Sequence, residues 1–183
     1  MLLKDGRNLI IRKAVKEDTS VLIDYIKDIG GESDNLTFGE NGLEMTVEEE
    51  EKFIENTNSS ATSALFVGFI ENKIVGSGII AAHTRERIAH QAEIGISVRK
   101  EFWGIGAGSC LMNEIIRFAK ETGKLEMLQL EVKEDNEPAI NLYRKCGFQE
   151  IGRRPNFFKV DDRYYDSIIM NLDLLQPPHL WHR

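Results

Sequence analysis

The sequence is poor in cysteine and has no long apolar run, and each absence excludes a class of protein. The only cysteines, Cys110 and Cys146, form neither a metal-type nor a redox-type pair, so we expect both to be small buried hydrophobic residues. No apolar stretch approaches the ~20 residues that cross a bilayer, so no membrane association is expected. Met1–Arg12 already carries four charged side chains and lacks the apolar core of a signal peptide, which predicts a cytoplasmic location.

An excess of basic residues is also missing. The chain has 23 Lys and Arg against 30 Asp and Glu, a net charge of -7. Proteins that bind nucleic acid usually present a basic face, so no nucleic-acid partner is expected. His179 and His182 near the end have no acidic or cysteine partners beside them, and no metal site is expected in the chain.

Seven segments have the apolar or alternating pattern of β-strands. They are Leu9–Arg12, Ala64–Ile70, Ile74–Ile80, Ala92–Val98, Met127–Val132, Gln149–Lys159 and Tyr164–Leu172. The 183 residues are enough for one domain, expected over residues 1–175, with a short tail at 176–183.

Helix signals separate several of these strands. The first helix is predicted at Lys16–Ile29, with Gly30 and Gly31 ending it. Thr46 and Glu49 have the spacing of a capping box that opens a second helix. The acidic run that includes Glu49 is expected to be a solvated first turn.

A third helix is predicted after a glycine-rich turn, with Gly123 as its stop, and a fourth from Pro138 to Gly147. The expected fold class is α/β (α+β): a mixed, largely antiparallel sheet of about seven strands, flanked by about four helices. In chain order, antiparallel strands come first, followed by a strand–helix–strand crossover, a helix and a closing hairpin.

The glycine-rich turn is the strongest functional signal. Gly104, Gly106 and Gly108 follow a strand at alternate positions and open a helix, a pattern that lets backbone N–H groups converge on a phosphate. A mononucleotide P-loop would need Gly-Lys-Ser/Thr, which is absent. A dinucleotide loop would need a third glycine or alanine where Ser109 stands. A glycine turn without a ligand stays open on these residues alone.

A second motif lies downstream. In Asn136–Phe148 an asparagine is followed at a fixed distance by Leu-Tyr-x-x-x-Gly-Phe. Together with Val98–Leu111, this segment resembles the two signature motifs of the GNAT superfamily of acyl-CoA-dependent N-acetyltransferases, in a bacterial branch related to ribosomal-protein and small-molecule acetyltransferases. The similarity extends over Leu9–Leu172. Trp103 departs from the pattern, which often has Gln or Arg there.

The resemblance implies acetyl-CoA as co-substrate and ten residues that contact it. They are Ile96, Ser97, Val98, Gly104, Ile105, Gly106, Ala107, Gly108, Ser109 and Asn136. The pyrophosphate is expected on the amides of 104–109, and the pantetheine arm along 96–98, almost as an added strand. Asn136 matches the asparagine that bonds this arm, although it also suits a helix cap. Arg99 and Lys100 are either contacts to outer phosphates or solvated surface residues.

The resemblance also implies catalytic groups. Tyr143 matches a tyrosine that protonates the departing thiolate, although its helical stripe equally suits a core aromatic. Glu93 and Glu131 lie on the flanking strands, where similar proteins carry a catalytic base; Glu93 is preferred, and either could instead be a solvated residue or an ion-pair partner. His83 and His90 flank the same region, where a structural role is the more usual one for an isolated histidine.

The implied reaction is direct attack of a primary amine on acetyl-CoA in a ternary complex. The alternatives are a non-catalytic acyl-CoA-binding module and transfer of another acyl group. The acceptor amine is expected to contact the first two helices, the loop Glu32–Glu44 and the final hairpin around Phe157, Phe158, Tyr164 and Tyr165. Many similar proteins pair, which is the basis for expecting a homodimer; no residue indicates one.

Overall fold

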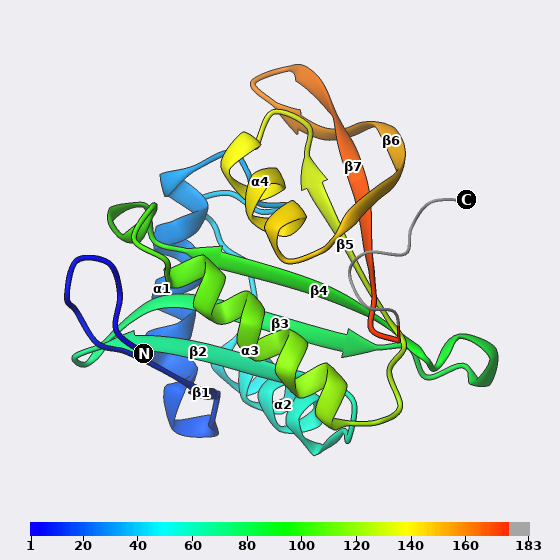
Figure 1. Cartoon of the computed structure of the whole chain (residues 1–183). Coiled ribbons are helices and arrows are strands. Elements are labelled where there is room, and N and C mark those ends of the chain that lie inside the picture. The colour runs from blue at the N-terminus through cyan, green and yellow to red at the C-terminus, as the bar shows by residue number, and fades with distance from the viewer. Residues whose placement is uncertain (176–183) are drawn as a thin grey trace.

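The computed structural model describes residues 1–175; the segment 176–183, with His179 and His182, lies outside the described residues. Within 1–175 the chain forms a seven-stranded sheet in the order β1-β2-β3-β4-β5-β7-β6 (Figure 1). The strands are β1 (Leu9–Lys13), β2 (Ala64–Ile70), β3 (Lys73–Ala82), β4 (Gln91–Val98), β5 (Met127–Lys133), β6 (Gln149–Val160) and β7 (Arg163–Asp173). All seven predicted strands are present, with ends that differ by at most two residues, and the predicted fold class is confirmed.

Helices cover both faces of the sheet. They are α1 (Thr19–Glu32), α2 (Val47–Ser59), α3 (Ala107–Glu121) and α4 (Glu137–Lys145), with 3₁₀ turns η1 (Lys16–Asp18), η2 (Glu86–Ile88) and η3 (Lys100–Phe102). Figure 1 shows α3 in front of the sheet, with α1 and α2 behind it. One core cluster joins α1 and α2 to β2 and β3, and another joins α3 and α4 to the strands. None of the helices in residues 1–175 is both long and apolar enough to span a bilayer.

Two glycines of β3 bring α3 close to the sheet. A Cβ at Gly76 would come within 2.7 Å of Leu111, and one at Gly78 within 2.9 Å of Ile115. Real Cβ atoms do not approach other atoms so closely, so a side chain at either position would force these methyl groups of α3 to shift. The packing positions the N-terminal end of α3 beside the end of β4.

The strands β4 and β5 are the parallel pair of the sheet, and they separate. Their register joins Gln91 to Met127, Ala92 to Leu128 and Glu93 to Gln129, and pairing stops there although both strands continue. The remaining neighbours in the sheet are antiparallel. The second half of β4 is therefore free of β5 along the edge that faces it.

The predicted end of the first helix is wrong. Gly30 and Gly31 lie inside α1, which continues to Glu32. A Cβ on Gly30 would come within 2.0 Å of the Gly39 carbonyl oxygen, so this glycine allows the following loop to cross the helix closely. The fourth helix also begins one residue early, at Glu137, with Asn136 as its N-cap.

The second helix confirms one prediction and corrects another. Glu49 N–H donates to the Thr46 hydroxyl at 3.2 Å, and Thr46 N–H donates to the Glu49 carboxylate at 2.9 Å, which is the predicted capping box. The acidic run is not wholly solvated, because Glu50 is 2% exposed. Glu50 lies one turn before the buried Ile54, on the face of α2 that meets the sheet. Cys110 and Cys146, predicted to be buried, are only partly so.

Candidate functional site

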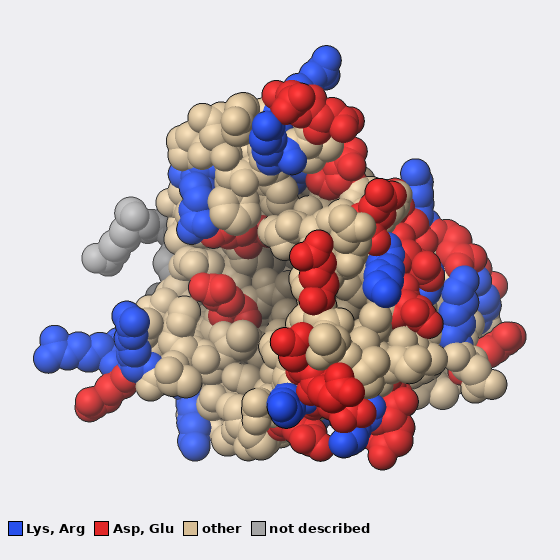
Figure 2. Space-filling view, turned by 180° about the vertical axis from the view of Figure 1, so that it is seen from behind, with Lys and Arg blue, Asp and Glu red and all other residues tan. Residues whose placement is uncertain are grey.

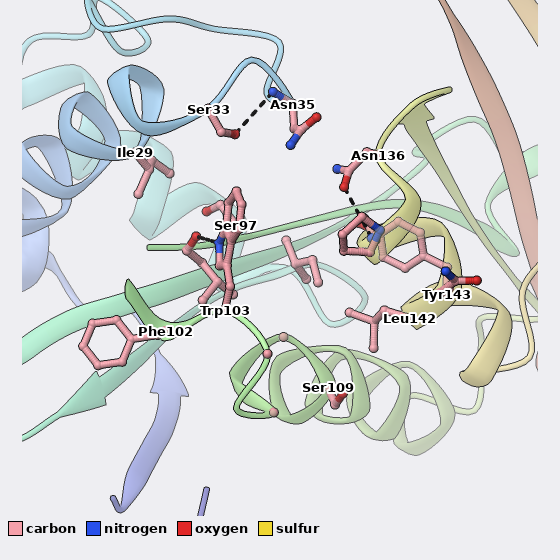
Figure 3. A pocket seen from close by; sticks show the side chains of 18 of the residues that line it. Ile29, Ser33, Asn35, Ser97, Phe102, Trp103, Ser109, Asn136, Leu142 and Tyr143 are labelled. Atoms are coloured by element: carbon pink, nitrogen blue, oxygen red, sulfur yellow. Dashed lines mark hydrogen bonds between the residues drawn. The ribbon is translucent and has the colours of Figure 1, made fainter. Parts of the chain in front are cut away.

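A cleft of about 660 Å³ opens between the end of β4, the glycine turn and α4, and we call it the glycine-loop cleft. Eight of the ten predicted cofactor contacts line it, together with Tyr143 (Figure 3). The eight are Ile96, Ser97, Val98, Gly104, Gly106, Gly108, Ser109 and Asn136. Ile105 and Ala107 are not among the lining residues, because both belong to the apolar cluster beneath the turn.

The glycine turn has positive φ angles, a backbone conformation that is strained for residues other than glycine. Gly104 and Gly106 have φ of 76° and 105°, and Gly106 is the left-handed N-cap of α3. The first-turn N–H groups of α3 have no partner within the helix, and this turn carries no acidic residue. The arrangement concentrates backbone donors and positive helix-dipole potential at one end of the cleft, which suits an anion.

The N-terminal segment adds a cation to this end of the cleft. Lys4 lines the cleft, its N–H donates to the Ile105 carbonyl at 3.1 Å, and its Nζ donates to the Gly104 carbonyl at 3.4 Å. Sequence analysis missed Lys4, because nothing local links residue 4 to residue 104. The contact exists because β1 and the residues before it lie beside the turn.

The end of β4 is held by side chains from three elements. The buried Tyr25 hydroxyl hydrogen-bonds the Ser97 hydroxyl at 2.9 Å, which in turn lies 3.1 Å from the Ser77 hydroxyl. Burial raises the pKa of Tyr25 above its usual value, so it stays a neutral phenol. Trp103 lines the cleft, and its indole N–H donates to the Val98 carbonyl at 2.6 Å (Figure 3). These contacts fix the strand end against the glycine turn.

The two basic residues after β4 do not reach the cleft. Arg99 is 9% exposed, donates from Nε to the Ile74 carbonyl at 2.9 Å and pairs with Asp28 at 2.8 Å. Lys100 donates its backbone N–H to Glu32 at 2.6 Å. Arg99 therefore ties α1 to the sheet, and neither residue lines the cleft. The phosphate role considered for them has no support in the geometry.

Tyr143 and Asn136 each make a structural contact and also line the cleft. Tyr143 is 7% exposed, belongs to the core beside Phe148, and also lines the cleft. Burial, with a smaller effect from Cys146, raises the pKa of Tyr143 to about 12, so the phenol keeps its proton at neutral pH. The Asn136 side chain caps α4 by accepting from Ala139 N–H at 3.3 Å, and it lines the cleft as well.

A second cavity of about 540 Å³ adjoins the first, and we call it the carboxylate pocket because Glu50, Glu93 and Glu131 line it. The molecular surface is hollowed on the side of α1 and α2, and acidic side chains lie around the hollow (Figure 2). The two cavities share lining residues, so they meet where β4 and β5 separate. The shared residues are Ile29, Asn35, Leu36, Ile96 and Ser97.

The two predicted base candidates are brought to the same pocket but have different partners. Glu93 pairs in register with Gln129, so Glu131, two residues on, lies on the same face of the sheet. Glu131 accepts from the Ser167 hydroxyl at 2.7 Å and pairs with Arg154 at 2.9 Å. Glu93 has no side-chain hydrogen bond or ion pair within residues 1–175. Its carboxylate is therefore left without a side-chain partner in the pocket.

The rest of the pocket partly matches the predicted acceptor region. Phe157 and Phe158 line it, as do residues of α1, α2 and the loop after α1, whereas Tyr164 and Tyr165 do not. Glu50 is a lining residue that the sequence analysis missed. Its place four residues before Ile54, on the apolar stripe of α2, was the available signal.

Neither His83 nor His90 lines either cavity, nor does either cysteine. Burial raises the pKa of the Cys146 thiol, which leaves it a poor nucleophile. Within the described residues, no group of three or more His, Cys, Asp or Glu side chains is arranged to hold a metal ion.

Comparison with known proteins places this architecture in a family. Residues 33–148 match the model of the Acetyltransferase (GNAT) family. The L-amino acid N-acetyltransferase AaaT of Escherichia coli is 32% identical over 104 residues, which are 57% of this chain and 64% of that protein. The chain thus spans less than two thirds of this curated relative.

Two solved structures extend the likeness to nearly the whole chain. A GNAT-family acetyltransferase of Streptococcus pneumoniae has a TM-score of 0.88 and 30% identity, covering 91% of this chain and 99% of that one. The putative acetyltransferase yncA of Salmonella typhimurium, with its cofactor acetyl-CoA, shares the fold at a TM-score of 0.80 and 16% identity, covering 92% of this chain and 95% of that one. The chain therefore belongs to the Acetyltransferase (GNAT) family.

Proposed function

We propose that the chain transfers an acetyl group from acetyl-CoA to a primary amine by direct attack in a ternary complex. One observation carries this proposal: two cavities of different chemistry meet at the open edge of β4. One cavity offers backbone donors for a phosphorylated molecule, and the other offers carboxylates for an amine. The Salmonella structure, which is a complex with its cofactor acetyl-CoA, supports the choice of donor.

In this proposal coenzyme A lies in the glycine-loop cleft. Its pyrophosphate meets the N–H groups of the turn and of the first turn of α3, and Lys4 adds a positive charge. The pantetheine arm follows the unpaired edge of β4 at 96–98, as an added strand does. The thioester then lies between Tyr143 and the junction with the carboxylate pocket.

The chemistry begins with the amine. A lysine-like ammonium with a pKa near ~10.4 costs about 4.6 kcal/mol to deprotonate at pH 7, so a base is required. Glu93 takes this proton, directly or through water, and the nitrogen attacks the thioester carbonyl. Main-chain N–H groups near 96–98 stabilise the oxyanion. The C–N bond forms and the C–S bond breaks. The thiolate takes a proton from Tyr143, and the second proton, which the attacking nitrogen loses as the amide forms, returns to Tyr143 through water.

The test is thiol release from acetyl-CoA with pools of small amines, amino acids and peptides, after calorimetry has established cofactor binding. We expect binding and amine-dependent release. Absence of any association with acetyl-CoA or CoA at millimolar concentration would overturn the proposal. Binding without transfer to any amine would leave the chain as an acyl-CoA-binding module.

Direct attack has its own test. Because neither cysteine lines the glycine-loop cleft or the carboxylate pocket, the double variant Cys110→Ser, Cys146→Ser should leave turnover intact in a folded protein. Loss of turnover in a folded double variant would indicate a covalent acyl-enzyme instead.

A cytoplasmic location, a homodimer and a single domain over 1–175 also stay predictions; light scattering tests the homodimer.

A further inference from the structure

All ionisable residues that line the carboxylate pocket are acidic. Its ionisable lining residues are Glu50, Glu93 and Glu131, and no Lys, Arg or His from the described residues joins them. An acceptor that carries its own carboxylate, such as an α-amino acid, would have to bury that anion beside like charges, and Arg154, the cation that contacts the pocket wall at Glu131 and Phe157, is already paired with Glu131. Burying a carboxylate beside other carboxylates without a free cation is costly, so the pocket disfavours amino acids as acceptors.

The three carboxylates are not equivalent. Arg154 and the Ser167 hydroxyl already occupy both oxygens of Glu131. Glu50 and Glu93 have no side-chain hydrogen bond or ion pair anywhere in residues 1–175. Two carboxyl groups of the pocket are therefore left for a ligand to pair with.

Of these two residues, Glu50 says more about the charge of the acceptor. It is 2% exposed and lines the pocket, and no fully buried side-chain oxygen in residues 1–175 lacks a partner, so the small exposed part of Glu50 includes its carboxylate, which is open to the cavity. Burial raises the pKa of Glu50, which is the behaviour of a carboxylate without a cation. Buried carboxylates in proteins are ordinarily paired, so the missing partner is expected to come from what binds there.

Apolar walls complete the pocket. Phe38 and Phe53 come from the loop after α1 and from α2, and Phe157 and Phe158 come from β6. Aromatic faces suit methylene groups and also attract ammonium ions. The pocket thus combines two unpaired carboxylates with a lining for an unbranched hydrocarbon chain.

We infer that the acceptor is an aliphatic diamine or polyamine, whose reacting nitrogen lies at Glu93 while a second ammonium group pairs with Glu50. This inference rests on the proposed function. It assigns Glu50 a role in acceptor selectivity, and it separates acceptors by the charge they carry beyond the reacting amine.

The test compares matched amines. In the wild-type chain, kcat/KM for 1,4-diaminobutane and 1,5-diaminopentane should exceed that for 1-aminobutane and 1-aminopentane by about tenfold or more, since a buried charged hydrogen bond contributes about 1.5–3 kcal/mol. L-Alanine and L-lysine should be poorer acceptors than the diamines. In Glu50→Gln the diamine-to-monoamine ratio should fall toward one.

Glu48→Gln is the matched control, because Glu48 is an exposed residue of the same turn. It removes one negative charge from α2 without touching the pocket, so the ratio should stay at the wild-type value. Equal ratios for wild type and Glu50→Gln would overturn the inference, as would amino acids or peptides being better acceptors than diamines.

A binding measurement keeps the two proposals separate. If acetyl-CoA binds and thiol release occurs with peptides alone, the proposed function stands and this inference fails. If no amine accepts the acetyl group, calorimetry of 1,5-diaminopentane against the CoA complex still decides: binding that Glu50→Gln weakens supports the inference, and no binding overturns it.

Discussion

The glycine-loop cleft and the carboxylate pocket are made from different kinds of atoms. The cleft presents backbone N–H groups of one continuous segment, whose glycines are required by φ of 76° and 105°. The pocket presents side chains from α1, α2, β4, β5 and β6. A site made by the main chain leaves a local pattern in the sequence, whereas a site made by convergent side chains does not. The following predictions test this division, beginning with the largest effect.

Replacing Glu93 should have the largest effect. Glu93→Gln removes the proposed base, and kcat/KM should fall by about 100-fold or more at pH 7, while the Kd for acetyl-CoA is retained. The loss should shrink toward pH 10, because the amine then loses its proton unaided. Steady-state kinetics at several pH values measures kcat/KM, and calorimetry measures the Kd for acetyl-CoA. A larger loss in Glu131→Gln would instead identify Glu131 as the base.

Replacing Gly106 should act on the other cavity. Gly106→Ala forces a side chain onto a left-handed φ of 105° and should raise the KM for acetyl-CoA by about tenfold, through displaced backbone donors. Gly123→Ala is the matched control: its φ of 62° is also left-handed and its site is open, but it lies outside the cleft. Equal KM changes in the two variants would show that the effect is only lost stability.

Tyr143→Phe should have a smaller effect. A thiolate leaves readily, so we expect kcat to fall by about tenfold or less. Because the pKa of Tyr143 is about 12, its phenol stays protonated through the usual assay range. The pH profile should therefore keep its shape in the variant. An alkaline limb near pH 9 that disappears in Tyr143→Phe would contradict this assignment.

The smallest expected effect is that of Glu50→Gln on the free energy of unfolding. Burial raises the pKa of Glu50 above 4.5, so the folded state binds this proton more tightly than the unfolded state. The contribution of Glu50 to stability is present below 4.5 and is lost as pH rises through the folded pKa. Glu50→Gln should raise the free energy of unfolding at pH 7, on the order of 1 kcal/mol, and by less at pH 4. Urea denaturation at the two pH values measures the difference, and a variant less stable than wild type at pH 7 would contradict it.

Much of the fold followed from local patterns. All seven strands and the capping box at Thr46 agree with the predictions, because alternation and cap spacing act over a few residues. The prediction failed at Gly30, where the reason for glycine is a contact with Gly39 across the loop. Arg99 was misassigned for the same reason, since its partners Asp28 and Ile74 are distant in sequence.

By itself, the sequence determined the order of helices and strands, the glycine turn and the family of the fold. These depend on backbone conformation and on short-range apolar patterns, which the local residues dictate. It also named Glu93 and Glu131 as candidate bases, with Glu93 preferred, but not the contacts that distinguish them. Their difference arises from Arg154 and Ser167, which β6 and β7 bring to Glu131 alone. Likewise, Lys4 meets the glycine turn and Glu50 meets the pocket only after the sheet has assembled, because each contact joins residues far apart in the chain.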